Sequence, residues 1–69
     1  MKISGRNQLK GTVKMIKKGP VNSEIVVSLP GGSEIVSIIT TYSAEKMNLK
    51  EGSPVYAVIK ASEVMIGVD

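Results

Sequence analysis

The sequence contains no histidine, cysteine, tryptophan or phenylalanine, and its only aromatic residues are Tyr42 and Tyr56. Without histidine or cysteine, the chain has no ligands for a soft metal, no redox-active thiol and no Ser-His or Cys-His nucleophile. A stabilising disulfide is also excluded. Two tyrosines provide few aromatic side chains on which nucleic-acid bases could stack. These absences disfavour most enzyme chemistry and weaken the case for a single-strand binder.

Long hydrophobic runs are missing as well. No apolar run approaches the ~18 residues needed to span a bilayer, and no hydrophobic signal segment follows the first residues. We therefore expect a cytoplasmic protein without a membrane segment. The net charge is +3, from 9 Lys+Arg against 6 Asp+Glu. This excess favours an anionic partner, but it does not choose between nucleic acid, membrane headgroups and small oxyanions.

The chain is short but rich in apolar residues. Its 69 residues, 42% of them hydrophobic, predict a single domain over residues 1–69. A domain of this size buries only about 60% of the surface that its unfolded chain exposes. Small domains without disulfides or metals often compensate by oligomerising. The nine Val and eight Ile against three Leu favour strands over helices.

Alternation and turn signals divide the chain into five expected strands and one short helix. Gly11 within the first strand indicates a bulge or a bend, and Gly-Pro and Pro-Gly-Gly mark turns. This order predicts an all-β fold with one short helix, an OB-like five-stranded Greek-key barrel. The expected strands cover residues 7–18, 23–29, 34–40, 55–60 and 64–68, with the helical turn at 41–47.

Two of these strands, at residues 34–40 and 55–60, are apolar on both faces. A small barrel fills only one face with its own core, so the second face needs another partner. A second copy of the chain is the simplest candidate. The alternative is an ordinary scatter of surface apolar residues.

Two polar clusters flank the expected barrel. Ser4 and Arg6 precede the first strand, and Arg6 is the only arginine, whose planar fork suits an oxyanion. Lys60, Ala61 and Ser62 stand between the last two expected strands, with a charge, a backbone N–H and a hydroxyl. The first cluster also reads as a solvated arm, and the second as a turn lysine with a capping serine.

Two further segments are weaker candidates. Thr40 and Ser43 stand at the expected start of the helix, where hydroxyls and unpaired N–H groups favour anions but more commonly cap the helix. The turn with Lys18, Gly19, Val21 and Asn22 could form an anion-binding nest, or a charged end that protects a sheet edge.

The clusters share one chemical property, since they supply donors and cations without carboxylates. A tetrahedral dianion has only acceptor oxygens and suits such a lining. The six acidic residues are scattered along the chain, so the sequence shows no pair of carboxylates suited to general acid–base catalysis. We therefore predict a binding protein and not an enzyme. The acidic residues are Glu24, Glu34, Glu45, Glu51, Glu63 and Asp69.

The run Ser-Gly-Arg-Asn-Gln-Leu-Lys-Gly at residues 4–11 resembles the opening motif of the molbindins, the Mop-type molybdate-binding proteins built from one TOBE-like domain. The likeness continues through Lys17-Lys18-Gly19, Gly31-Gly32, residues 37–39 and Gly52. It ends with Lys-Ala-Ser-Glu-Val-Met-Ile at residues 60–66, and so covers nearly the whole chain. Gly5 departs from the alanine that is common in the family, which removes only a methyl group.

The resemblance implies a cytoplasmic homohexamer, a trimer of dimers, that binds molybdate and usually tungstate at subunit interfaces for storage or buffering. No cofactor and no direct metal ligand are implied. Ser4 and Arg6 would contact the oxyanion from one subunit, and Lys60, Ala61 and Ser62 from another. Thr40 and Ser43 match hydroxyl positions of related molybdate-sensing domains. A possible second site near a three-fold axis would use Lys18, Gly19, Val21 and Asn22.

The sequence is also compatible with two alternative functions. An oligomeric OB-like barrel with a basic pI also suits a nucleic-acid-binding protein, although we expect no nucleic-acid partner because aromatic residues are so few. A free-standing regulatory TOBE module, paired with a larger chain, would have little affinity of its own for an anion.

Overall fold

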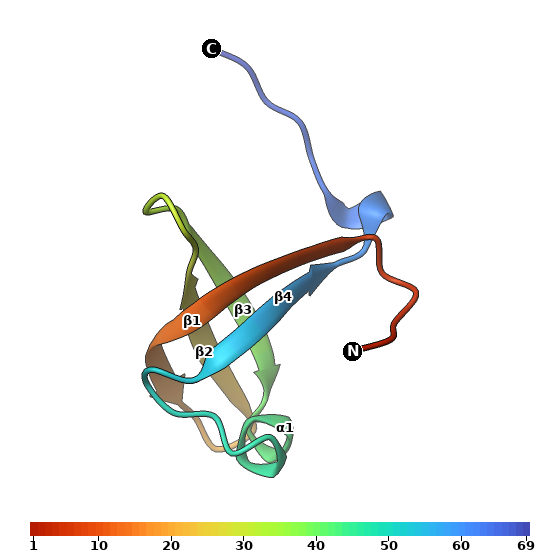
Figure 1. Cartoon of the computed structure of the whole chain (residues 1–69). Coiled ribbons are helices and arrows are strands. Elements are labelled where there is room, and N and C mark those ends of the chain that lie inside the picture. The colour runs from red at the N-terminus through yellow and green to blue at the C-terminus, as the bar shows by residue number, and fades with distance from the viewer.

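The computed structural model describes residues 1–69, and it consists of one curled antiparallel sheet with a short helix. Figure 1 shows both chain ends leaving the sheet as irregular segments, of which the N-terminal one bends back and the C-terminal one runs away from the sheet. The sheet has four strands in the order β3-β2-β1-β4. The elements are β1 (Asn7–Lys18), β2 (Asn22–Ser28), β3 (Glu34–Thr40), α1 (Thr41–Lys46), β4 (Pro54–Ile59) and a 3₁₀ turn, η1 (Ala61–Glu63).

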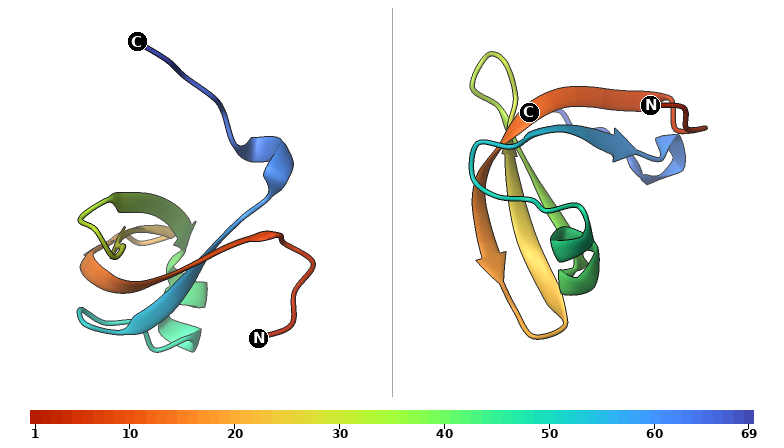
Figure 2. Two further views of the ribbon diagram at one scale, coloured as in Figure 1. Left: turned by 45° about the horizontal axis from the view of Figure 1, so that its top comes forward. Right: turned by 60° about the horizontal axis from the view of Figure 1, so that its bottom comes forward.

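The long strand β1 belongs to both halves of the sheet. Its first half pairs with β4, from Asn7 opposite Ile59 to Thr12 opposite Pro54. Its second half pairs with β2, and a bulge interrupts the register between Val13 and Met15. Such a bulge bends a strand and increases its twist. β1 therefore curls the sheet into a half-barrel (Figure 2).

Gly11 lies in β1 close to the irregularity of the strand, where the sequence predicts a bulge or a bend. A Cβ atom at this position would stand 2.7 Å from both Ser28 O and Val27 Cγ1. The backbone of β1 thus approaches β2 more closely than any side chain would allow. The bulge itself falls three residues later, at Lys14, whose ammonium pairs with the Glu34 carboxylate on β3.

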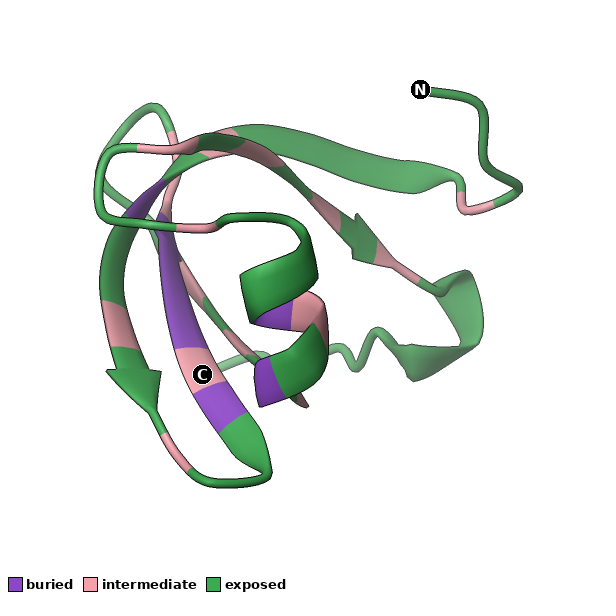
Figure 3. Cartoon of the chain, turned by 90° about the horizontal axis from the view of Figure 1, so that it is seen from below, coloured by how far each residue is buried: buried purple, intermediate pink, exposed green.

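The core is small and lies in the curve of the sheet. Val13, Ile25, Val27 and Ala44 are buried there, and only 7 of 69 residues are buried in the whole chain. Figure 3 shows α1 within the curve, with buried positions on the helix and on β2. Val26 of β2 is buried outside this cluster, and the other apolar residues stay partly or fully exposed, so the chain alone leaves much of its apolar surface in water.

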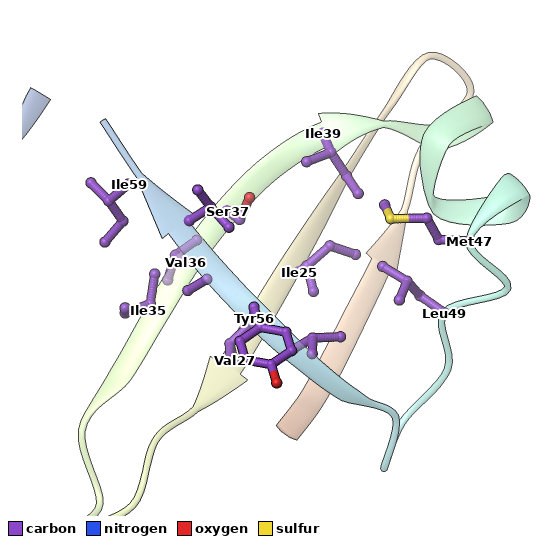
Figure 4. A pocket seen from close by; sticks show the side chains of 13 residues that line it. Ile25, Val27, Ile35, Val36, Ser37, Ile39, Met47, Leu49, Tyr56 and Ile59 are labelled. Atoms are coloured by element: carbon purple, nitrogen blue, oxygen red, sulfur yellow. The ribbon is translucent and has the colours of Figure 1, made fainter. Parts of the chain in front are cut away.

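The half-barrel is open between β3 and β4, which do not pair with each other. An apolar cleft of about 330 Å³ occupies the gap. Figure 4 shows side chains of β2, β3, β4 and the segment after α1 lining it, Ile25, Ile39, Leu49 and Tyr56 among them. Each of the two outer strands keeps one unpaired edge.

The first four expected strands and the helix are confirmed, and each begins and ends within one residue of its predicted limits. The fifth strand, expected at residues 64–68, is not confirmed, because the segment has no regular structure in the single chain. A strand requires a neighbouring edge, but η1 directs the chain away from the sheet (Figure 1). Met65, Ile66 and Val68 are 91–95% exposed. The five-stranded Greek-key barrel is therefore not confirmed, and the chain forms a four-stranded half-barrel that is mostly β with one short helix, as predicted.

Two buried hydroxyls attach α1 to the β1–β2 turn. Thr41 Oγ1 donates to Gly19 O at 2.7 Å and lies 2.7 Å from Ser23 Oγ. Because the Thr41 proton is engaged with Gly19, Ser23 is the donor in the second bond. The Thr41 N–H donates to Val21 O at 2.8 Å. These contacts fix the helix against the turn where β1 and β2 meet.

Thr41→Val should destabilise the fold by about 1–3 kcal/mol, because it leaves the buried Ser23 hydroxyl and Gly19 carbonyl without their partner. Urea denaturation at a fixed protein concentration measures the change. Thr12→Val, at an exposed position of β1, is the matched control. Equal stability of the two variants would contradict a structural role for the Thr41 hydroxyl.

Candidate anion-binding site

The candidate site is a depression at the end of the sheet where β1 begins and β4 ends. Its volume is about 590 Å³. Figure 1 shows the N-terminal arm and the η1 turn meeting at this end of the sheet. The lining residues are Ile3, Ser4, Gly5, Arg6, Val58, Lys60, Ala61 and Ser62.

Strand pairing explains why the two predicted clusters meet. β1 and β4 are antiparallel, and their last pair is Asn7 opposite Ile59. The residues just before β1 and just after β4 must therefore leave the sheet side by side. Ser4 and Arg6 line the same depression as Lys60 and Ser62, within a single protomer. The resemblance assigned these clusters to different subunits, whereas here each protomer holds both.

The η1 turn sets the geometry on the β4 side. The first backbone hydrogen bond of the turn runs from the Glu63 N–H to Lys60 O, at 2.9 Å. The N–H groups of Ala61 and Ser62 stand before this bond and remain outside the turn's own pairing. Lys60 is extended, with φ −64° and ψ 131°. The turn therefore offers two backbone donors beside the Ser62 hydroxyl.

The charge of the depression is entirely positive. Arg6 and Lys60 form no ion pair, since the two ion pairs of the chain join Lys14 to Glu34 and Lys18 to Glu45. No aspartate or glutamate lines the depression. A guanidinium, an ammonium, hydroxyls and backbone N–H groups form a set that suits an anion with only acceptor oxygens.

The hydroxyls of Thr40 and Ser43 lie elsewhere. Thr40 is the N-cap of α1: its Oγ1 accepts from the Ser43 N–H at 3.1 Å and donates to Ser43 Oγ at 2.8 Å. α1 lies at the end of the sheet remote from the arm (Figure 1). The fold therefore does not bring these two hydroxyls to the depression, and both take part in helix capping.

The turn between β1 and β2 keeps Lys18, Gly19 and Asn22 together around a shallow depression of about 280 Å³. Its groups are already engaged, since Lys18 Nζ pairs with Glu45 Oε2 at 2.7 Å and the Gly19 carbonyl accepts from Thr41. The Glu24 carboxylate also lines the depression. Val21 is 70% exposed and lies outside this lining. This surface is less suited to an anion than the first.

Sequence reading missed several contacts beneath the arm. The Gln8 side chain donates to Gly5 O, and Gly5 packs on Val58. The only feature of the sequence that could have indicated these contacts is the polar pair Asn7-Gln8, directly after Arg6. The alternation of polar and apolar residues assigned this pair to the first strand. No group of three or more acidic residues lies close enough to hold a metal ion. Neither α1 nor the η1 turn has the length or the hydrophobicity of a membrane-spanning helix.

Fold and depression together define a small curled β-sheet protein with a basic, donor-lined site at one end. The model of the TOBE domain family matches residues 3–66. The chain therefore belongs to the TOBE domain family, and its full-length relatives place it among the Mop-type members. This confirms the predicted family.

Three similar proteins illustrate the relationship. Molybdenum-pterin-binding protein 1 of Clostridium pasteurianum is 50% identical over 66 residues, which is 96% of this chain and 97% of that protein. The structure of a molybdate-binding protein from Sporomusa ovata superposes with a TM-score of 0.91 at 44% identity, over 99% of this chain and all of that one. The cytoplasmic molybdate-binding protein ModG, solved with molybdate bound, gives a TM-score of 0.94 at 46% identity, and the chain spans 49% of its length.

These relatives are named for binding and not for a reaction. Their agreement over nearly the whole chain confirms the prediction of a binding protein in place of an enzyme.

Proposed function

We propose that the chain binds molybdate, and tungstate with it, as a cytoplasmic store or buffer for the oxyanion. The observation that carries this proposal is the depression lined by Ser4, Arg6, Lys60, Ala61 and Ser62, which contains no carboxylate. Relatives of similar length are named for molybdenum-pterin or molybdate binding, and ModG is described as cytoplasmic. Residues 1–69 act in this proposal as one binding domain.

The complete site lies at an interface between subunits. Ser4, Arg6, Lys60, Ala61 and Ser62 are all exposed, so one protomer forms only one wall of the depression. Charge-assisted hydrogen bonds strengthen when water is excluded. A second copy placed over the depression would exclude that water and add its own donors. In the proposed assembly the depressions of two neighbouring subunits face each other, so that the arm residues of one subunit and the Lys60–Ser62 segment of the other enclose the anion together.

The assembly is a homohexamer, a trimer of dimers. Self-association is supported by the open cleft between β3 and β4, by their unpaired edges and by the exposed apolar segment at residues 64–68. A chain with only 7 buried residues has much to gain from such contacts. Lys18, Gly19, Val21 and Asn22 remain the proposed second site near the three-fold axis, and Thr40 and Ser43 the least supported anion contacts.

Selectivity follows from the donor set. Monohydrogen phosphate carries a proton that needs an acceptor, and the depression offers no carboxylate to receive it. An unpaired buried donor is costly. Molybdate and tungstate carry no such proton at neutral pH and are nearly the same size, so the site should bind both.

Isothermal titration of the wild-type chain tests this proposal. Molybdate and tungstate should give saturable binding of similar strength, and phosphate should bind at least about tenfold more weakly, the effect of one unpaired buried group. A single-stranded oligonucleotide should give no heat. Heat with the oligonucleotide and none with molybdate would establish the nucleic-acid alternative in its place.

Arg6→Ala should weaken molybdate binding by about ten- to hundredfold, because it removes charge-assisted hydrogen bonds to the dianion. Lys2→Ala, on the same arm but outside the lining, is the matched control and should bind almost normally. Titration calorimetry measures both, with native mass spectrometry to verify that assembly is unchanged. If Arg6→Ala and Lys2→Ala have equal affinity, Arg6 is not part of the site.

Val36→Asp should disrupt the assembly and lower molybdate binding with it. Val36 is an apolar residue of β3 that is 61% exposed in the single chain and borders the open cleft. A buried unpaired carboxylate at an interface is strongly unfavourable. Sedimentation velocity measures the change, and Thr12→Asp, at an exposed polar position of β1, is the control. An intact assembly in the Val36 variant would exclude this face from the interface.

A further inference from the structure

Asn7 is a polar residue on an apolar face of the sheet. Residues directly opposite each other in an antiparallel pair share one face, and so do alternate residues of one strand. Asn7 therefore shares its face with Leu9 on β1 and with Ala57 and Ile59 on β4. Ala57 and Ile59 line the apolar cleft. A polar residue that interrupts an apolar pattern is expected where function requires it.

The Asn7 side chain connects the two strands at the edge of the site. Its Nδ2 donates to Ile59 O at 3.3 Å, across the last pair of the β1–β4 ladder. The Ile59 carbonyl belongs to the peptide group that joins Ile59 to Lys60, so the bond holds the chain at the point where it leaves β4. Arg6 directly precedes Asn7 in the sequence. One residue therefore links the N-terminal arm to the segment that begins at Lys60.

The end of β4 has little other support within the single chain. β4 is an edge strand, and β1 is its only partner in the sheet. The ladder between the two strands stops at the pair Asn7–Ile59, and the next residue, Lys60, is exposed. Segments with few attachments open most easily. The Asn7 side chain thus adds a hydrogen bond where the ladder would otherwise begin to open.

The charges at this end of the sheet make such a bond useful. Arg6 and Lys60 line one depression, and no acidic residue lies in the lining, so in the absence of an anion the two cations repel each other. Binding that must first order two separate segments loses part of its free energy to that ordering. Groups that are held in position beforehand avoid this loss.

We propose that Asn7 is a positioning residue of the anion site. Its backbone fixes the start of β1 after Arg6, and its amide fixes the peptide group before Lys60, so the two sides of the depression keep a constant separation. Asn7 itself does not line the depression. The inference rests on the proposed oxyanion binding, and it adds a residue that sets the strength of that binding.

Asn7→Leu tests the hydrogen bond, since leucine has nearly the same size and shape but cannot donate. Molybdate affinity, measured by titration calorimetry, should fall about two- to tenfold, the range expected for one hydrogen bond. Asn7→Gln keeps the donor on a longer side chain and should bind molybdate more tightly than Asn7→Leu. Thr12→Val, at the other end of the β1–β4 ladder, is the matched control and should bind normally. Unchanged affinity in Asn7→Leu, or equal losses in Asn7→Leu and Asn7→Gln, would overturn the proposal.

Hydrogen exchange of the anion-free protein gives a second readout. The backbone amides of residues 60–62 should exchange several times faster in Asn7→Leu than in the wild type, because the end of β4 opens more often. Thr41→Val weakens the fold from α1, at the end of the sheet remote from the arm (Figure 1). It should leave both this exchange and the molybdate affinity unchanged. If Asn7→Leu behaves like Thr41→Val in both readouts, its role is merely structural and the proposal is wrong.

The two readouts separate this inference from the proposed function. If the wild-type chain binds no molybdate, the proposed function fails, but exchange at residues 60–62 still reports whether Asn7 holds the end of β4. Faster exchange in Asn7→Leu then supports this role of Asn7, and unchanged exchange overturns it. Native mass spectrometry of each variant verifies that the assembly is that of the wild type.

Discussion

The pairing of β1 with β4 is the constraint on which the candidate site depends. Because the two strands are antiparallel and their ladder ends at Asn7 and Ile59, residues separated by most of the chain leave the sheet together. The bulge and the close approach at Gly11 let the same strand turn and pair with β2. One bent strand therefore builds the small core at one end and gathers the polar site at the other.

The site has the chemistry that the composition leaves available. A chain without histidine or cysteine cannot hold a metal ion through soft ligands, but an oxyanion requires none. It requires cations, hydroxyls and N–H groups, and the depression collects these without a carboxylate. The two acids that do form ion pairs, Glu34 and Glu45, neutralise lysines elsewhere on the sheet and leave Arg6 and Lys60 unpaired.

Much of the fold could be predicted from local pattern. Alternation and turn residues located β1 to β4, and the capping threonine located α1, because these signals act between near neighbours in sequence. The same reasoning failed at residues 64–68, where β-branched residues favour a strand but no partner edge lies within reach in the single chain. The candidate site residues were predicted from donor chemistry and from the family resemblance. Their meeting in one protomer, the close approach of Gly5 to Val58 and the Thr41 hydroxyl pair depend on tertiary contacts that no local pattern encodes.

Native mass spectrometry of the wild-type chain, with and without molybdate, tests the central claim most directly, because it reports the number of subunits and the number of bound anions together. The account predicts a homohexamer whose mass increases by whole molybdate units when the anion is added. A monomer, or an assembly whose mass does not change with molybdate, would contradict it.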